Sequence, residues 1–289
     1  MELKINLRIF GVYKHIMTQL QKETIELIKS GHSVSEIAKK LNRNMSSIST
    51  IVKRCNITSY KKLNENKCDH NYFDKVTTET QAYLLGFFIA DGWLSENRFG
   101  VQIQEEDSYI LNHYQHFSKA KIFTINRTTN TISRKNQCTI KWTSGHMRET
   151  FEGLNILQNK TYHTDFLFPF HKIPPELHRH VVRGFLDGDG GIESNKGTFT
   201  IVLVSTSEGF LKQLGEHITT LYEGIGIKIS KKQGKTVNYY SLRFNFNRCN
   251  KPAKVTQIYN YLYKDLSIFL SRKKKKFESY LEYRGKLEN

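Results

Sequence analysis

Apolar residues near the start of the chain recur at the spacing of an α-helix. In the stretch 19–57 they fall three or four positions apart, as in Val34, Ile37 and Leu41, so that each run can bury one side. The pattern predicts three short helices, the last two joined by the polar turn 42–44. With the apolar residues of the third helix facing inward, its polar and basic side chains point outward: Ser46, Ser47, Thr50, Lys53 and Arg54.

Two short helices joined by a tight polar turn are typical of a helix-turn-helix, whose second helix fits the major groove of DNA. We therefore interpret residues 1–60 as a helix-turn-helix DNA-binding domain, with an ordinary helical hairpin as the alternative. Residues 61–78 are polar and show no clear period, which predicts a linker to the rest of the chain.

From about residue 80 onward the chain repeats itself. The segment 82–93, AYLLGFFIADGW, is mirrored by 180–191, HVVRGFLDGDGG, and the matching aspartates are 98 positions apart (189 minus 91). Each copy is followed by the patterns of a hairpin, a helix, further strands and a helix. The sequence thus predicts an α+β fold of two pseudo-symmetric αββαββα repeats, over 79–175 and 176–289.

The composition indicates a polyanionic partner and an intracellular location. The 289 residues carry 44 Lys and Arg against 27 Asp and Glu, a net charge of +17, and phosphate backbones are the usual partner of such an excess. The four cysteines are scattered without a CxxC pair, which argues against a disulfide framework or a zinc ribbon. We expect a reducing compartment: cytoplasm, nucleoid or an organelle matrix.

A membrane or secretory location is not expected. No apolar stretch approaches the roughly 20 residues of a membrane helix. The first residues, MELKINLRIF, lack the sustained apolar run of a secretory signal. We therefore expect neither a membrane partner nor secretion.

Small residues recur four positions apart in both copies of the repeated motif. They are Ala82, Gly86 and Ala90 in the first copy and Gly184 and Gly188 in the second. Side chains this small let two helix backbones approach closely. We therefore expect the two copies to form helices that pack against each other.

Such packing would bring Asp91 and Asp189 together, each at the C-terminal end of its helix. Two carboxylates at the negative ends of helix dipoles repel each other unless a cation compensates. Mg²⁺ accepts carboxylate oxygens while keeping several waters, and beside a basic surface this arrangement indicates phosphodiester hydrolysis. For a single copy, structural capping by Asp-Gly would be the simpler interpretation.

The repeated motif resembles that of the LAGLIDADG homing endonucleases. LLGFFIADG at 84–92 and VRGFLDGDG at 182–190 align with the nine-letter motif without gaps, and the resemblance covers about residues 80–289. Two copies in one chain are similar to the monomeric, pseudo-symmetric members of that family. One departure is the sixth motif position, which is Ile89 in the first copy and Asp187 in the second.

The resemblance also implies roles for individual residues. Asp91 and Asp189 match the positions that bind the catalytic metal ions. A basic residue of the family's water pocket corresponds to Lys160 in the first repeat and to Lys273 in the second, with Lys274 as a rival. Such a lysine would polarise water or offset charge that develops in the transition state. A polar residue of the same pocket corresponds roughly to Glu105, near the end of an early strand.

The strand-like segments fit a DNA-binding saddle. In 137–143 and 239–246 apolar and polar residues alternate, which gives each strand one buried face and one polar face. Basic, hydroxyl and amide groups suit contacts with base edges and phosphates, although a solvated sheet face is the alternative. The candidate contacts are Gln102, Gln104, Thr139, Lys141, Ser241, Arg243 and Asn245.

Together these features predict a monomeric, Mg²⁺-dependent, site-specific endonuclease of double-stranded DNA, whose N-terminal domain extends the footprint. The family resemblance implies residence in a mobile intron or a free-standing gene. Two alternatives share the fold: a DNA-binding transcriptional regulator that has lost catalysis, and an RNA-binding maturase that acts on intron RNA. Retention of both motif aspartates counts against the regulator.

Overall fold

The computed structural model of the chain forms two compact units, Met1–Lys67 and Cys68–Asn289. The residues that it describes are 18–29, 32, 34–55, 68–125, 128–129, 132–133, 135–195, 198–246 and 251–288. Residues 1–17 and 56–60 of the predicted helix-turn-helix domain, and 61–67 of the predicted linker, lie outside this set.

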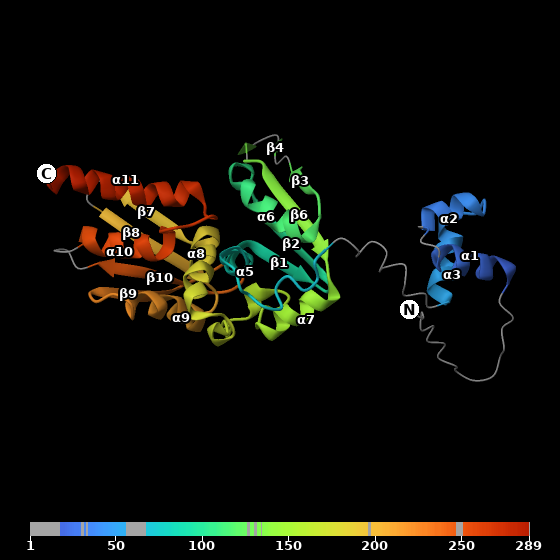
Figure 1. Cartoon of the computed structure of the whole chain (residues 1–289), viewed down its shortest axis with the longest axis horizontal. Coiled ribbons are helices and arrows are strands. Elements are labelled where there is room, and N and C mark those ends of the chain that lie inside the picture. The colour runs from blue at the N-terminus through green and yellow to red at the C-terminus, as the bar shows by residue number, and fades with distance from the viewer. Residues whose placement is uncertain are drawn as a thin grey trace. The chain divides into compact units, whose positions relative to one another are not determined.

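The described part of the N-terminal unit contains three helices: α1 (Gln19–Lys29), α2 (Val34–Lys40) and α3 (Met45–Arg54) (Figure 1). Ile28, Ile37 and Ile48, one from each helix, are at most 1% exposed and make up its small core with their neighbours. The turn between α2 and α3 passes through Asn42 at φ 47°, a left-handed conformation that asparagine tolerates well. The three helices form as the apolar pattern predicts, and the predicted outward residues of α3 are exposed: Ser46, Ser47, Thr50, Lys53 and Arg54.

The C-terminal unit, called the body below, begins with the first repeat. Its elements are α5 (Glu79–Asp91), β1 (Gly92–Ser95), β2 (Arg98–Gln104), η1 (Glu105–Asp107), α6 (Tyr109–Ser118), β3 (Ile122–Ile125), β4 (Thr128–Thr129), β5 (Ile132–Ser133), β6 (Gln137–Thr143) and α7 (Gly145–Gly153). The antiparallel sheet has the strand order β1-β2-β6-β3, while β4 and β5 pair separately.

The second repeat follows three short 3₁₀ helices: η2 (Lys160–Tyr162), η3 (Phe170–Lys172) and η4 (Pro175–Leu177). Its elements are α8 (His178–Asp189), β7 (Gly191–Asn195), β8 (Thr198–Ser205), α9 (Glu208–Thr219), β9 (Ile225–Lys232), β10 (Tyr239–Phe246), α10 (Lys251–Tyr263) and α11 (Ser271–Glu288). The strand order β7-β8-β10-β9 reproduces that of the first repeat. The predicted α+β fold with an internal duplication is therefore confirmed.

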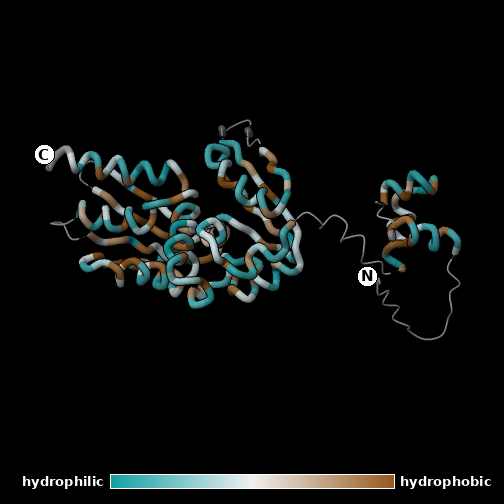
Figure 2. The backbone as a smooth tube through the Cα atoms, in the orientation of Figure 1, coloured by the Kyte–Doolittle hydropathy of each residue, from teal (hydrophilic) through white to brown (hydrophobic). Residues whose placement is uncertain are grey.

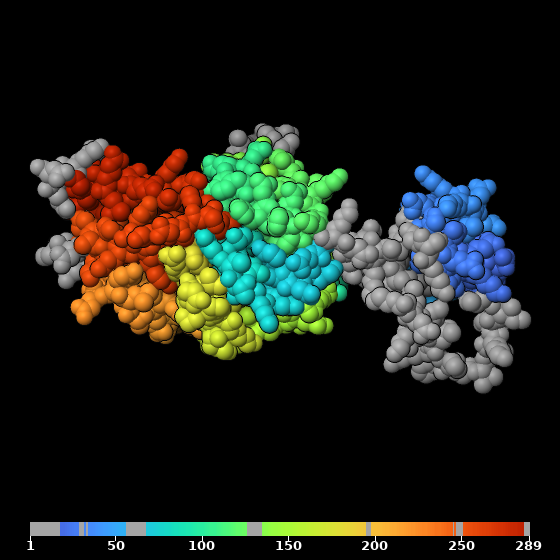
Figure 3. Space-filling view, in the orientation of Figure 1, coloured from blue at the N-terminus to red at the C-terminus, as the bar shows by residue number. Residues whose placement is uncertain are grey.

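Helices α5 and α8 pack against each other at the centre of the body, with a sheet on either side (Figure 1). Every residue of α5 from Ala82 to Ala90 is buried, because one side faces α8 and the other faces the first sheet. Figure 3 shows the two repeats in direct contact there, cyan beside yellow. Peripheral helices such as α11 instead alternate hydrophobic and hydrophilic residues along their length (Figure 2).

Residues 68–78, which we predicted to be part of the linker, belong to the body. Phe73 and Val76 are 2% and 6% exposed within its core, and Phe73 makes an edge contact with Phe151 at 5.3 Å between ring centroids. Thr78 then starts α5 with a capping box, in which its hydroxyl accepts from the Gln81 amide. The sequence pattern did not reveal this packing, because Phe73 and Val76 are isolated apolar residues in a polar segment.

Among the helices that the structure describes, none combines the length and the apolar character needed to cross a membrane.

Candidate functional site

The two motif aspartates lie side by side at the ends of the central helices. Asp91 is the last residue of α5 and Asp189 the last residue of α8. A Cβ atom built on Gly188 would lie 3.1 Å from Oδ2 of Asp91, so the first carboxylate reaches across to the end of the opposite helix. The motif glycines that follow, Gly92 and Gly190, turn each chain directly into the first strand of its repeat.

Both carboxyl groups are electrostatically unfavourable as anions. Burial, followed by the negative charge of Asp189, raises the pKa of Asp91 to about 6. Burial also raises the pKa of Asp189, although its side chain reaches the surface, while the charges of Lys160 and Lys273 oppose that rise. Within the described part of the chain, no hydrogen bond or ion pair ends on either carboxylate. Among the described residues, the pair thus has no direct hydrogen-bond or ion-pair partner, although Lys160 and Lys273 are close enough for their charges to act on both carboxylates.

The ammonium groups of Lys160 and Lys273 lie against the C-terminal ends of α5 and α8, one at each helix. Nζ of Lys160 donates to the carbonyl of Phe88 at 3.1 Å and also to those of Ile89 and Ala90. Nζ of Lys273 donates to the matching carbonyls of α8, those of Leu186 (2.6 Å), Asp187 and Gly188 (3.2 Å). Each ammonium therefore satisfies the free carbonyls, and the negative dipole end, of one motif helix.

The two lysines differ in their surroundings. Lys273 is 3% exposed at the start of α11, whereas Lys160 is partly exposed in η2. Burial lowers the pKa of each to about 8, and nearby aspartates oppose the shift. Lys160 and Asp189 both line a pocket of about 320 Å³ whose other walls include Ile89, Phe185 and Phe210.

The structure also places the less certain candidates of the water pocket. Lys274 points away from the aspartates, with Nζ 3.5 Å from Glu278 and 4.6 Å from the Phe269 ring centroid. Glu105 is exposed, and its carboxylate accepts from the Asn136 amide at 3.1 Å. No described contact links Glu105 to the aspartate pair.

Asp187 has a structural role that the sequence did not reveal. This carboxylate is 0% exposed and accepts hydrogen bonds from the hydroxyls of Tyr83 (2.9 Å) and Tyr263 (2.7 Å) and from the amide of Leu270 (2.8 Å). The Leu270 carbonyl in turn accepts from the amide of Lys273 at 3.0 Å. Asp187 thereby fixes the segment that delivers Lys273. Its one signal in the sequence was the mismatch with Ile89 in the other copy.

The predicted polar faces of the sheets are present, with two corrections. Lys141, Arg243 and Gln104 are exposed and Gln102 is partly exposed, as the alternation predicts. Thr139 and Ser241, however, are only 3% and 6% exposed, so their predicted exposure on the polar faces is wrong. The backbone of Asn245 lies in β10, but its side chain is outside the described part.

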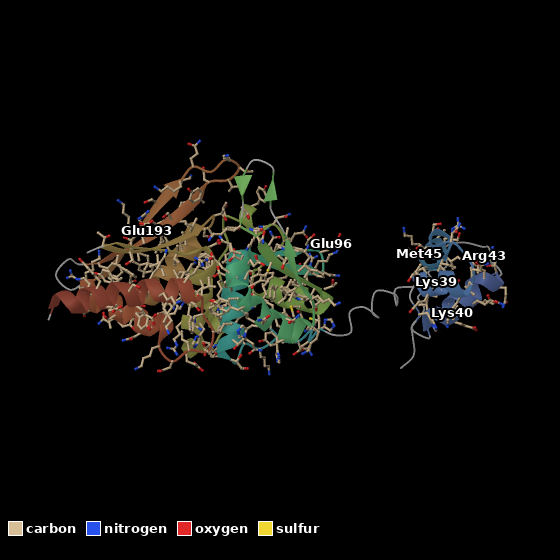
Figure 4. All side chains as sticks on the ribbon, turned by 90° about the horizontal axis from the view of Figure 1, so that it is seen from above. Lys39, Lys40, Arg43, Met45, Glu96 and Glu193 are labelled. Atoms are coloured by element: carbon tan, nitrogen blue, oxygen red, sulfur yellow. The ribbon has the colours of Figure 1, made fainter. Side chains whose placement is uncertain are left out.

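Strand register adds residues to these faces that the sequence reading missed. Trp93 lies opposite Gly100, and a Cβ on Gly100 would be 2.4 Å from its indole ring. Nζ of Lys141 is 5.9 Å from that ring. In the second sheet Lys228 lies opposite Arg243. Arg243 is also 3.7 Å from Glu193, which Figure 4 labels. The register between strands determines which residues lie next to each other on the sheet, and the sequence of one strand alone does not specify that register.

The donor set at the aspartate pair suits one kind of metal. Across the described residues, no group of three or more His, Cys, Asp or Glu side chains could hold an ion. Two carboxylates alone fit Mg²⁺, which keeps several waters and takes substrate phosphate oxygens, better than they fit zinc or calcium. Burial and the charge of Asp189 raise the pKa of Asp91, and a cation bound at the pair would oppose that rise.

Comparison with known proteins identifies the second repeat. Residues 176–280 match the family model described as a LAGLIDADG-like domain. No curated protein matches the sequence. Among solved structures, the homing endonuclease I-WcaI bound to its DNA recognition sequence is 14% identical, with a TM-score of 0.43 over 72% of this chain and 90% of that one.

Two further structures show a similarly remote likeness. The N-terminal LAGLIDADG domain of DUF199/WhiA is 12% identical, with a TM-score of 0.41 over 72% of this chain and 92% of that one. I-SmaMI bound to cleaved DNA is 12% identical, with a TM-score of 0.41 over 73% and 89%. The match to the LAGLIDADG-like domain covers residues 176–280, and the sheet of the first repeat has the same strand order as the sheet of that segment.

Proposed function

We propose that this protein is a site-specific endonuclease that cuts both strands of a DNA duplex. The observation that carries the proposal is the pair Asp91 and Asp189, one from each repeat, side by side and without a hydrogen-bond donor in the described part of the chain. An arrangement that costs folding free energy is best explained by a function that needs it. The two-fold repeat provides one polar sheet face for each half of a duplex.

Mg²⁺ is the cofactor that we propose for this site, held by the carboxylates of Asp91 and Asp189. When bound, it would supply a water of lowered pKa and stabilise the leaving oxygen of the phosphodiester. Lys160 and Lys273 hold their ammonium groups at the ends of α5 and α8, near the carboxylates, where they would offset negative charge that develops in the transition state.

Double-stranded DNA is the proposed partner for reasons of charge and surface. The chain carries a net charge of +17, and exposed Lys141 and Arg243 lie on the polar faces of the two sheets. Amide groups such as those of Gln102 and Gln104 are suited to adenine edges. We further propose that the protein acts as a monomer, because one chain supplies both repeats.

The N-terminal unit is proposed to extend the DNA contact as a helix-turn-helix. Its α3 presents exposed hydroxyl and basic side chains, among them Ser47, Lys53 and Arg54. Figure 4 shows Lys39 and Arg43 on the same unit, on α2 and the turn before α3, and both are exposed. Backbone phosphates would be contacted from α2 and base edges from α3.

The competing function is a DNA-binding regulator on the same fold. A regulator would need the sheets and α3 but not two repelling carboxylates with a lysine at each helix end. The same arrangement occurs in both repeats of this chain, which favours the nuclease. A mobile intron as the host element would be supported if the cleaved site matched the gene sequence into which an intron carrying this reading frame is inserted.

Cleavage of a randomised duplex library tests the proposal. The full chain should release a defined set of cut sites with Mg²⁺ and none with EDTA. Asp91→Asn and Asp189→Asn should abolish cutting while leaving binding of the selected duplex largely intact, and Asp165→Asn, at an exposed position, serves as the matched control. Tight, specific binding without cutting by the wild-type chain in Mg²⁺ or Mn²⁺ would establish the regulator instead.

A further inference from the structure

Glu193 is an acidic residue on a surface that otherwise suits DNA. The strand pairings place it on the polar face of the second sheet, which also presents Arg243. Of the strand residues that the structure describes, Glu193 is the one acid, and its side chain is 64% exposed. Phosphates repel a carboxylate, so general attraction to DNA does not explain this residue.

The side chain of Arg243 reaches across the sheet to Glu193. Arg243 lies in β10 and Glu193 in β7, with strand β8 between them. Nη1 of Arg243 is nevertheless 3.7 Å from Oε2 of Glu193, an ion pair without a hydrogen bond. Within the described part of the chain, neither side chain has a hydrogen-bond partner. The guanidinium donors and the carboxylate acceptors are therefore available to a ligand.

This combination of groups matches one kind of base pair in the major groove. Guanine presents two adjacent acceptors, N7 and O6, and its partner cytosine presents the N4 amino donor beside them. Arginine binds N7 and O6 with two hydrogen bonds, and glutamate accepts from N4. Because O6 and N4 are paired with each other, the groups that bind them must be neighbours, as these two are. An A·T pair offers no two adjacent acceptors to a guanidinium.

The first repeat shows that the fold does not require such a pair. By strand register, Lys141 is the counterpart of Arg243. Ser95 is the counterpart of Glu193. In place of a carboxylate, Lys141 has the ring of Trp93 at 5.9 Å. The acid and the arginine thus belong to the second repeat, so the two halves of a target would be read by different groups.

We propose that Arg243 and Glu193 together read one G·C base pair, Arg243 on the guanine and Glu193 on the cytosine. The base pair lies in the half of the target that the second repeat covers. The inference rests on the proposed function and adds a base preference to it. Glu193 acts as a specificity residue: it lowers affinity for DNA in general and offsets that loss only on cytosine.

Binding selection with the full chain tests the proposal. Sites are enriched from a randomised duplex in EDTA and, in parallel, in Ca²⁺, and each base pair of the enriched site is then changed in turn. Fluorescence anisotropy gives Kd for wild type and variants. Glu193→Gln and Arg243→Ala should each lose discrimination at the same G·C pair, by about tenfold or more.

Affinity for unrelated duplex provides a second readout. Glu193→Gln should bind such DNA more tightly than wild type, because a negative charge has left the polar face. Arg243→Lys, which keeps the charge but not the two-donor fork, should retain this affinity and lose the preference for guanine. Glu176→Gln, at an exposed position in η4 outside the sheets, is the matched control and should keep wild-type discrimination.

Base analogues identify the atoms that are read. Replacing the guanine by 7-deazaguanine removes the N7 acceptor. It should weaken binding by wild type and Glu193→Gln but not by Arg243→Ala. Inosine keeps N7 and O6 and lacks only the minor-groove amino group, so it should bind like guanine. Equal effects of 7-deazaguanine on all three proteins would overturn the contact with Arg243.

The remaining outcomes separate this inference from the nuclease itself. Loss of discrimination at different base pairs in Glu193→Gln and Arg243→Ala, or at an A·T pair, would overturn the joint reading. A site that is enriched and cut, with unchanged discrimination in Glu193→Gln, would remove the inference and leave the nuclease. An enriched site that responds to both variants but is never cut would support the base reading without the nuclease. A chain that enriches no site would remove both.

Discussion

Gly86 faces the backbone of Val181 so closely that a Cβ atom on the glycine would lie 2.0 Å from the valine carbonyl oxygen. Reciprocally, a Cβ atom on Gly184 would lie 2.1 Å from the carbonyl oxygen of Tyr83. These two contacts bring the α5 and α8 backbones together and so set the distance between the two aspartates. The small-residue stripe is therefore a requirement of the site as well as of the fold.

Gly86→Ala should destabilise the body by about 3 kcal/mol or more, because the added methyl meets backbone that cannot rotate away. Urea unfolding followed by circular dichroism measures the loss. Gly285→Ala is the matched control, since nothing lies within 4 Å of its Cβ position inside helix α11. That variant should gain about 0.5–1 kcal/mol from helix propensity. Equal stabilities for the two variants would contradict the close packing.

Removing one aspartate should stabilise the metal-free protein in a pH-dependent way. The pKa of Asp91 is raised from 3.8 to about 6 in the folded state, so the folded protein holds this proton more tightly than the unfolded chain. The free energy of unfolding of the wild-type protein therefore falls as the pH rises from about 4 to about 6, because Asp91 loses its proton over this range. The Asp91→Asn variant should be as stable as wild type near pH 4 and more stable than wild type above about pH 6.

Thermal unfolding in EDTA across that pH range checks this expectation. Asp165→Asn, at an exposed position, should follow wild type throughout. Addition of Mg²⁺ at neutral pH should raise the Tm of wild type more than that of Asp91→Asn, because the ion binds the folded state only. Identical Mg²⁺ responses would argue against a metal at the pair.

Asp187→Leu should cost about 3–5 kcal/mol, because three buried donors, from Tyr83, Tyr263 and Leu270, would lose their acceptor. Tyr263→Phe removes one of these bonds and should cost about 1 kcal/mol. Chemical denaturation gives both values. If Asp187→Leu lowered the free energy of unfolding by less than Tyr263→Phe does, the three hydrogen bonds to Asp187 would not stabilise the body as proposed.

Lys53→Ala should weaken binding of the selected duplex and reduce the slope of log affinity against log salt by about 1, as expected for one phosphate contact from α3. Fluorescence anisotropy at several salt concentrations measures the slope. Lys22→Ala, on the exposed side of α1, should leave it unchanged. The same slope for both variants would argue against DNA contact by α3.

The sequence predicted much of the fold because local patterns suffice for it. Period-two alternation located β6 and β10, and the duplicated motif located α5 and α8. The boundary at 61–78 was partly wrong, since the two anchors Phe73 and Val76 stand alone in a polar stretch. Thr139 and Ser241 are buried although alternation predicts exposed side chains there, because burial depends on tertiary packing that the pattern of one strand does not contain.

For the site, the motif by itself determined which residues meet: two aspartates at helix ends, on a duplicated and strongly basic chain. Tertiary structure decided how they meet. The direction of the Asp91 side chain, the choice of Lys273 over Lys274 and the anchoring of Lys273 through Asp187 all depend on contacts between residues about 70–100 positions apart. A repeat period encodes position along a helix, whereas the packing of one helix on another fixes which charges face each other.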